Sequence, residues 1–189
     1  MYTGVLNIFG RYWQAYGGGS ALVRSPYLHA AAVLLVLTYA TWSQNGWWEQ
    51  VLSVMPNLLG FTLGGFAMFL GFGDEKFRSL LAEPDEDAIG EPTLYVSICA
   101  TFVHFIVVQL FALVAAVVAK SWWFYFPWPE PIRVFLPFLN LFGWAFGYAF
   151  FLYALTSVLA ATMHVFRIAT MYEQHQQVQA TNRASNDEK

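Results

Sequence analysis

The sequence predicts an all-α, polytopic membrane protein with four transmembrane helices and both termini in the cytoplasm. Composition, four long apolar stretches and the distribution of basic residues support this prediction. Hydrophobic residues make up 58% of the chain and charged residues 11%, whereas a soluble domain has roughly 45–50% and about 25%. A soluble domain of this length keeps a large surface that needs charge. Most of the surface is therefore expected to face lipid.

Four apolar stretches are long enough to cross a membrane, because a hydrocarbon core of about 30 Å needs roughly 20 helical residues. We expect a four-helix transmembrane domain over 26–166, with spans at about 26–42, 51–72, 93–119 and 134–166. The first span is the shortest, and the third is long enough to tilt or protrude. The fourth is expected to continue out of the membrane as a helix.

The basic residues predict the orientation. Seven of the nine Lys and Arg residues lie in the N-terminal segment 1–25, the loop 73–92 and the tail 167–189, and the other two lie in 120–133. Because basic residues accumulate on the cytoplasmic side of a membrane, all three segments are predicted to be cytoplasmic. The outward loops are short and aromatic, with Trp47 and Trp48 in the first and the run 122–129 in the second. Such loops are typical of an interfacial belt. A lipid- or envelope-sensing surface would use the same aromatic rings.

The loop 73–92 is the main polar insertion. Spacings of three and four predict that Phe77, Leu80 and Leu81 share one face of a short amphipathic helix between the second and third spans. An acidic, proline-containing run follows at 83–92. Such a run is usually a solvated loop, although it could also bind a basic partner surface.

Polar side chains form a stripe in the third span. Ser97, Thr101 and His104 are spaced by four and three residues and so share a helical face. Hydrogen bonding between helices is the simpler interpretation. The alternative is that His104 is a titratable switch or lines a pore. The core of each predicted span lacks Asp, Glu, Lys and Arg, which disfavours a proton pump or an ion-coupled transporter.

Two glycine pairs predict close helix packing. Gly60 and Gly64 form a GxxxG pair in the second span, and Gly143 and Gly147 form another in the fourth. Helices in lipid gain little from apolar burial, so they rely on close backbone approach. The spacing leaves open whether these contacts lie within one subunit or between subunits.

The sequence offers little support for catalysis. It contains no paired-His metal motif, no Cys-x-x-Cys, no Gly-Lys-Ser/Thr loop and no nucleophile elbow. We therefore expect a protein that is not an enzyme and that holds no cofactor or metal. A net charge of −3 gives no basic field for nucleic acid.

The stretch from Pro56 to Phe77 resembles a segment of the small four-span bacterial membrane proteins of antiphage defence, such as the membrane subunits of Kiwa systems. The more specific part of the resemblance is its Gly73–Phe77 end. The resemblance implies a non-enzymatic sensor in the bacterial inner membrane that forms a homo-oligomer and holds a cytosolic effector protein at the membrane. It also implies that the cytoplasmic contact surfaces are the Asp74–Arg78 segment and the tail 167–189, with candidate residues Asp74, Glu75, Lys76, Phe77, Arg78, Arg167 and Tyr172.

Three functional hypotheses follow. The leading one is a membrane sensor or scaffold that binds a cytosolic protein. The second is a channel-forming oligomer whose pore is lined by Ser97, Thr101 and His104, since a hydrophobic constriction needs no charged residue. The third is a small membrane enzyme or lipid carrier, which would require a pocket that brings His104, Gln109 or Asn140 together.

Overall fold

The computed structural model describes residues 2–71, 73–84, 90–122 and 129–187, and these residues form eight helices and no strand. The helices are α1 (Tyr2–Tyr16), α2 (Gly18–Arg24), α3 (Pro26–Leu37), α4 (Tyr39–Trp42), α5 (Trp47–Gly71), α6 (Glu75–Ala82), α7 (Leu94–Trp122) and α8 (Glu130–Asp187). The predicted all-helical fold class is thus confirmed. The aromatic loop 123–128 and residues 85–89 of the acidic run lie outside the described residues.

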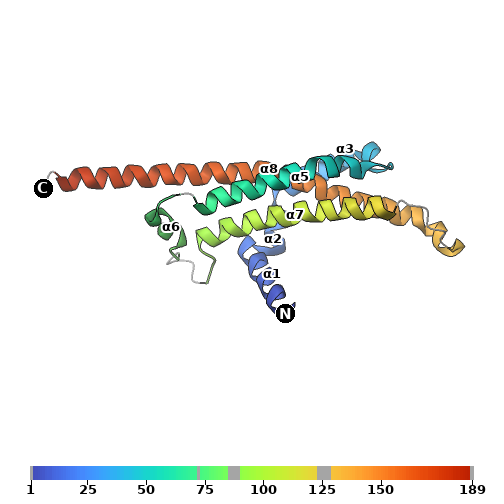
Figure 1. Ribbon diagram of the computed structural model, residues 1–189, viewed down its shortest axis with the longest axis horizontal. Helices are drawn as coiled ribbons and strands as arrows, with labels where there is room; N and C mark the ends of the chain where they lie inside the picture. The colour runs from blue at the N-terminus through green and yellow to red at the C-terminus, as the bar shows by residue number, and fades with distance from the viewer. Residues whose placement is uncertain (1, 72, 85–89, 123–128, 188–189) are drawn as a thin grey trace.

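The bundle is built from α3, α5, α7 and α8, which lie along the long axis of the molecule (Figure 1). Helices α5, α7 and α8 are each long and apolar enough to cross a membrane. A fourth crossing is possible if α2 and α3, which are bent by 55°, form one span. Helix α1 projects sideways from this bundle, and α8 continues past the other helices to the C-terminus (Figure 1).

The first predicted span, 26–42, is divided in the structure. Helix α3 begins at Pro26, a position where a proline is well tolerated. The preceding Ser25 is extended, as residues before proline usually are, and this produces the bend from α2. At the other end, the Thr38 hydroxyl donates to the Leu34 carbonyl at 2.7 Å. The Trp42 indole donates to the Leu35 carbonyl at 2.7 Å, so the carbonyl at the break is satisfied by α4.

One close helix contact forms around a glycine. A Cβ on Gly147 of α8 would lie 2.7 Å from the Trp47 ring of α5 and 3.3 Å from the Ala115 Cβ of α7. A Cβ on Gly60, Gly64 or Gly143 would meet no atom within 4 Å. Only one of the four predicted packing glycines therefore makes a close contact within the described part of this chain.

The aromatic pair Trp47 and Trp48 belongs to the core. The sequence predicted that this pair lies in an outward interfacial belt, but both side chains are buried. Their rings pack against those of Tyr148 and Trp144 of α8, with centroids 5.9 and 6.2 Å apart. The pair closes the end of the bundle between α5 and α8 because α8 passes directly beside it.

Helix α6 is fixed at its first turn. Gly73 has a φ of +82°, a conformation that favours glycine. The Asp74 carboxylate then caps the helix by accepting a hydrogen bond from the Phe77 amide at 2.8 Å, as residues at this position commonly do. Phe77 and Leu81 are buried, but Leu80 is exposed. The predicted three-residue apolar face is therefore corrected to two residues, since only this i, i+4 pair points to the bundle.

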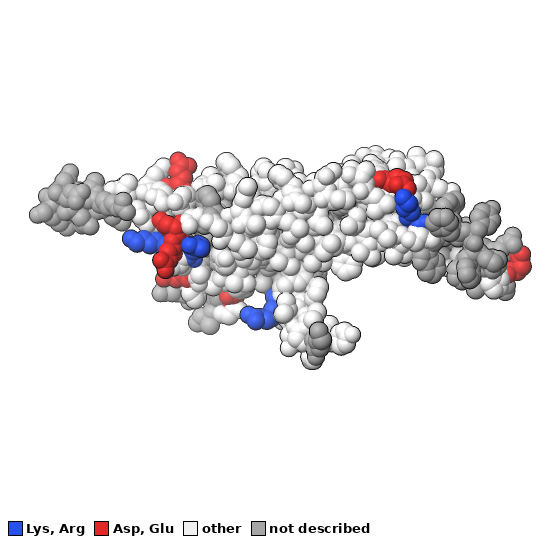
Figure 2. All heavy atoms as spheres, in the orientation of Figure 1, with Lys and Arg blue, Asp and Glu red and all other residues white. Residues whose placement is uncertain are grey.

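An apolar belt of membrane thickness lies along one face of the bundle. Arg11 and Arg24 border hollows that also touch Ala100 and Thr101 of α7. Near the other end of α7, Lys120 pairs with Glu49 at 2.9 Å. Ala100 and Lys120 are twenty positions apart, and twenty helical residues rise about 30 Å. Figure 2 shows that the face between these charged groups is free of charge, and its height matches a hydrocarbon core.

Candidate functional site

A buried histidine joins α1 to the bundle. His104 of α7 is buried, and its Nδ1 lies 3.1 Å from the Tyr12 hydroxyl of α1. Its Nε2 lies 3.0 Å from the Tyr153 hydroxyl of α8. The Tyr153 hydroxyl also lies 3.3 Å from that of Tyr16. A neutral imidazole has one donor and one acceptor nitrogen, so the two hydroxyls satisfy both of them.

Aromatic stacking strengthens the same contact. The Tyr16 ring lies parallel to the His104 ring, with centroids 3.8 Å apart and an interplanar angle of 17°. Such ring pairs contribute about 0.5–1.5 kcal/mol, and each hydrogen bond about 1 kcal/mol. No residue of α1 is fully buried. The position of α1 therefore depends mainly on this histidine junction, which we define as Tyr12, Tyr16, His104 and Tyr153.

The predicted stripe in α7 is divided between two environments. Ser97 and Thr101 border a small cavity of about 50 Å³ between α7 and α8, together with His164 and Arg167. The Thr101 hydroxyl donates to the Ser97 carbonyl of its own helix at 2.9 Å. His104 lies beneath α1. Within one chain, the stripe is thus covered by α8 and α1.

The three residues that would have marked a carrier or enzyme pocket are not assembled. Gln109 donates to the Thr62 hydroxyl of α5 at 2.9 Å. His104 instead contacts α1 and α8. Asn140 is exposed on α8. These polar groups therefore do not converge on one pocket.

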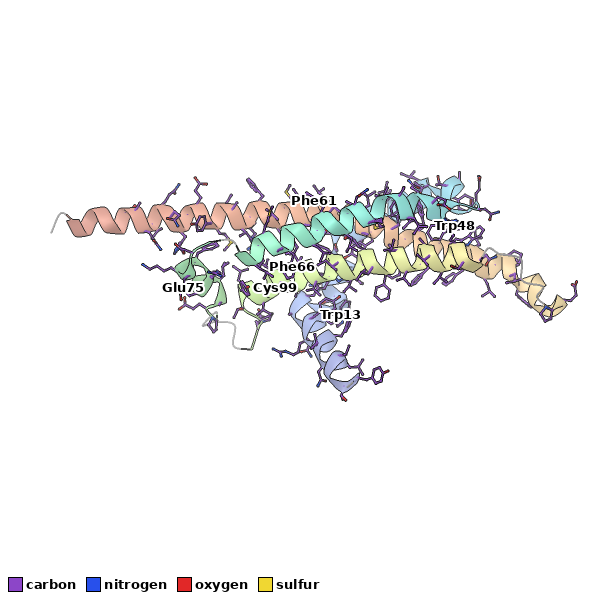
Figure 3. All side chains as sticks on the ribbon, in the orientation of Figure 1. Trp13, Trp48, Phe61, Phe66, Glu75 and Cys99 are labelled. Atoms are coloured by element: carbon purple, nitrogen blue, oxygen red, sulfur yellow. The ribbon has the colours of Figure 1, made fainter. Side chains whose placement is uncertain are left out.

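A second candidate site lies at the end of the bundle where α6 is located. Figure 3 labels Glu75 of this helix. Phe77 is buried, and its ring centroid lies 5.0 Å from that of Tyr172 and 5.7 Å from that of His175. Two of the predicted contact residues, Phe77 and Tyr172, therefore attach α6 to α8. The others are exposed, namely Asp74, Glu75, Lys76, Arg78 and Arg167.

A groove separates the exposed parts of α6 and α8. It has a volume of about 380 Å³ and is bordered by Lys76, Ser79, Leu80, Glu83 and His175. We call this set the α6–α8 groove. Leu80 is an exposed apolar side chain among charged neighbours. The groove can therefore accept an apolar side chain of a partner that carries charges around it.

The described residues contain no group of three or more His, Cys, Asp or Glu side chains that could hold a metal ion. The role of α1 was not predicted from the sequence, in which its residues were interpreted only as part of the cytoplasmic segment 1–25. A signal was present, because Ile8, Tyr12 and Tyr16 repeat at four-residue spacing. That spacing indicates an amphipathic helix but cannot identify His104 as its contact.

Replacing His104 with alanine is expected to release α1, because both hydrogen bonds and the Tyr16 stack are lost. Hydrogen exchange of the amides in residues 2–16 should accelerate about tenfold or more, with little change in α7 and α8. His29→Ala is the matched control, since His29 is exposed on α3. Unchanged exchange of α1 in His104→Ala would show that other contacts hold the helix.

No protein-family model matches the chain, and no curated protein or solved structure matches it either. Its function must therefore be inferred from the geometry of its own residues.

Proposed function

We propose that this protein is a non-enzymatic scaffold and sensor of a bacterial inner membrane that recruits or regulates a cytosolic effector protein. The observation that supports the proposal is the α6–α8 groove. There the short capped helix α6 packs against α8, which extends far beyond the apolar belt. The groove presents charged and apolar side chains from fixed positions. A preorganised surface of this kind loses little entropy when a partner binds.

The orientation proposed for the chain supports this role. The excess of Lys and Arg in 1–25, 73–92 and 167–189 favours the cytoplasmic side for both termini. Helix α6 and the last part of α8 lie at the same end of the molecule (Figure 1). In this orientation the α6–α8 groove faces the cytosol, where a soluble effector can reach it.

The chemistry of the groove suggests what the partner surface contains. Leu80 offers an apolar contact, Lys76 offers a cation beside it, and Glu83 offers a carboxylate. An apolar anchor flanked by one acidic and one basic side chain on the effector would complement this pattern. Surface charges of this kind mainly set the association rate and the specificity.

A role in antiphage defence is part of the proposal and rests on the resemblance of the Pro56–Phe77 segment. The sensing part of the role is assigned to α1, whose attachment through the histidine junction can open without disrupting the bundle. Release of α1 would change the membrane-facing surface while the α6–α8 groove stays assembled.

Self-association is also part of the proposal. Gly60 and Gly64 lie on an exposed face of α5, and neither contacts another helix of the described chain. A GxxxG pair without an intramolecular partner can bring the backbones of two copies together. In α8, by contrast, Gly147 already packs against Trp47. We therefore assign the homo-oligomeric contact to α5.

Reversing the charge of the groove tests partner recruitment. The variant Lys76→Glu is expected to lower recovery of a cytosolic partner from native membranes about tenfold or more, because its carboxylate then opposes the acidic side chain of the partner. The same cells should lose protection in a phage plating assay. Lys120→Glu is the control, since Lys120 is exposed at the opposite end. Equal partner recovery from both variants would contradict recruitment through the groove.

Bulky side chains on α5 test the oligomer. Gly60→Leu with Gly64→Leu is expected to shift the native mass in detergent toward the monomer, because leucine side chains keep the helices apart. Gly143→Leu is the matched control, because its Cβ position is equally open on α8. A monomeric wild-type protein, or loss of the oligomer only in Gly143→Leu, would contradict the assignment.

A further inference from the structure

A hollow of about 710 Å³ lies between α1 and α7 and is bordered at one end by Gly90, Glu91 and Pro92. Its α1 wall contains Ile8, Arg11 and Ala15, which repeat at spacings of three and four. Its α7 wall contains Val96, Ala100 and Val103, which are spaced in a similar way. Figure 3 shows that one end of α1 lies beside α7 near the labelled Cys99, which also borders the hollow.

The two charged residues of the hollow have opposite charges. Arg11 supplies a guanidinium from α1, and Glu91 supplies a carboxylate from the segment before α7. Neither side chain forms an ion pair or a hydrogen bond with another residue in the described ranges. A guanidinium binds a phosphate through two parallel hydrogen bonds. A carboxylate accepts hydrogen bonds from a primary ammonium group.

The hollow lies at the depth of a lipid headgroup. Thr101, next to Ala100 in α7, borders two other hollows that contain Arg24 and Arg167, so one edge of the apolar belt lies at this level and the other lies at Lys120. Val96 is one helical turn beyond this edge. Headgroups increase the thickness of a bilayer from about 30 Å to about 40–45 Å, so one turn beyond the edge lies among them. Apolar walls with a phosphate-binding cation at this depth suit an amphiphile better than a freely soluble anion.

We propose that the hollow binds one phospholipid whose headgroup contains both a phosphate and a primary ammonium, such as phosphatidylethanolamine. Arg11 holds the phosphate, Glu91 accepts hydrogen bonds from the ammonium, and the acyl chains pass beside α1 into the bilayer. Because α1 forms one wall, the bound lipid couples its position to the composition of the membrane. The proposal rests on the membrane depth of the hollow and does not require partner recruitment.

Lipid binding can be measured by native mass spectrometry of the full chain in detergent, titrated with phosphatidylethanolamine, phosphatidylcholine or inorganic phosphate. The wild type is expected to retain one phosphatidylethanolamine more tightly than phosphatidylcholine, whose choline has no N–H to donate. Arg11→Gln should weaken both lipids about tenfold, because a charge-assisted contact is lost. Glu91→Gln should remove the preference between them.

A pair of tryptophan variants controls for general effects on the protein. Val96→Trp should fill the hollow and abolish retention, whereas Val117→Trp should leave it intact. The two valines are 45% and 48% exposed on the same helix, and only Val96 borders the hollow. Equal retention by both variants, or displacement of the lipid by equimolar inorganic phosphate, would overturn the proposal. Partner recovery is measured separately, so this failure is distinguishable from failure of the proposed function.

Discussion

The fold depends on one constraint, which is that hydrocarbon offers no water to the backbone. Every N–H and C=O group within the apolar belt must then bond within the chain, and long helices achieve this. Only 17%, 39% and 33% of the most apolar windows of α5, α7 and α8 are buried inside the protein. The remaining apolar surface is favourable because lipid surrounds it. The same side chains would be a large uncovered patch in water.

This constraint also explains where polar side chains lie within the bundle. His104 is satisfied by tyrosine hydroxyls from two other helices, and Gln109 donates to Thr62. Each contact joins helices that apolar burial alone would not hold together. At the histidine junction, the contact does more than stabilise the bundle. It fixes a projecting helix that forms one wall of the proposed lipid site, so membrane composition and helix position become linked.

The sequence predicted those features that depend on local pattern and on lipid as the solvent. Long apolar runs indicated α5, α7 and α8, and the spacing of Phe77, Leu80 and Leu81 indicated α6. It did not predict contacts that depend on distant neighbours. His104 meets Tyr12 and Tyr153 across 92 and 49 residues.

Two further differences have the same origin. Trp47 and Trp48 were expected in an interfacial belt because of their position next to the end of a span. That position does not reveal that α8 passes beside them. Gly143 and Gly147 have identical spacing signals, but only Gly147 faces the Trp47 ring. Side-chain identity and spacing predict which face of a helix can pack closely. They do not predict which neighbour arrives there.

The fold requires the bundle to lie in lipid while the last part of α8 lies in water. Spin labels at Val114→Cys and Val178→Cys, both in a Cys99→Ala background, test this directly, since the two valines are 57% and 59% exposed. In lipid vesicles, the label on α7 should collide with oxygen and be shielded from a water-soluble nickel complex. The label on α8 should show the opposite behaviour. Equal access of the nickel complex to both labels would contradict the placement of the bundle in lipid.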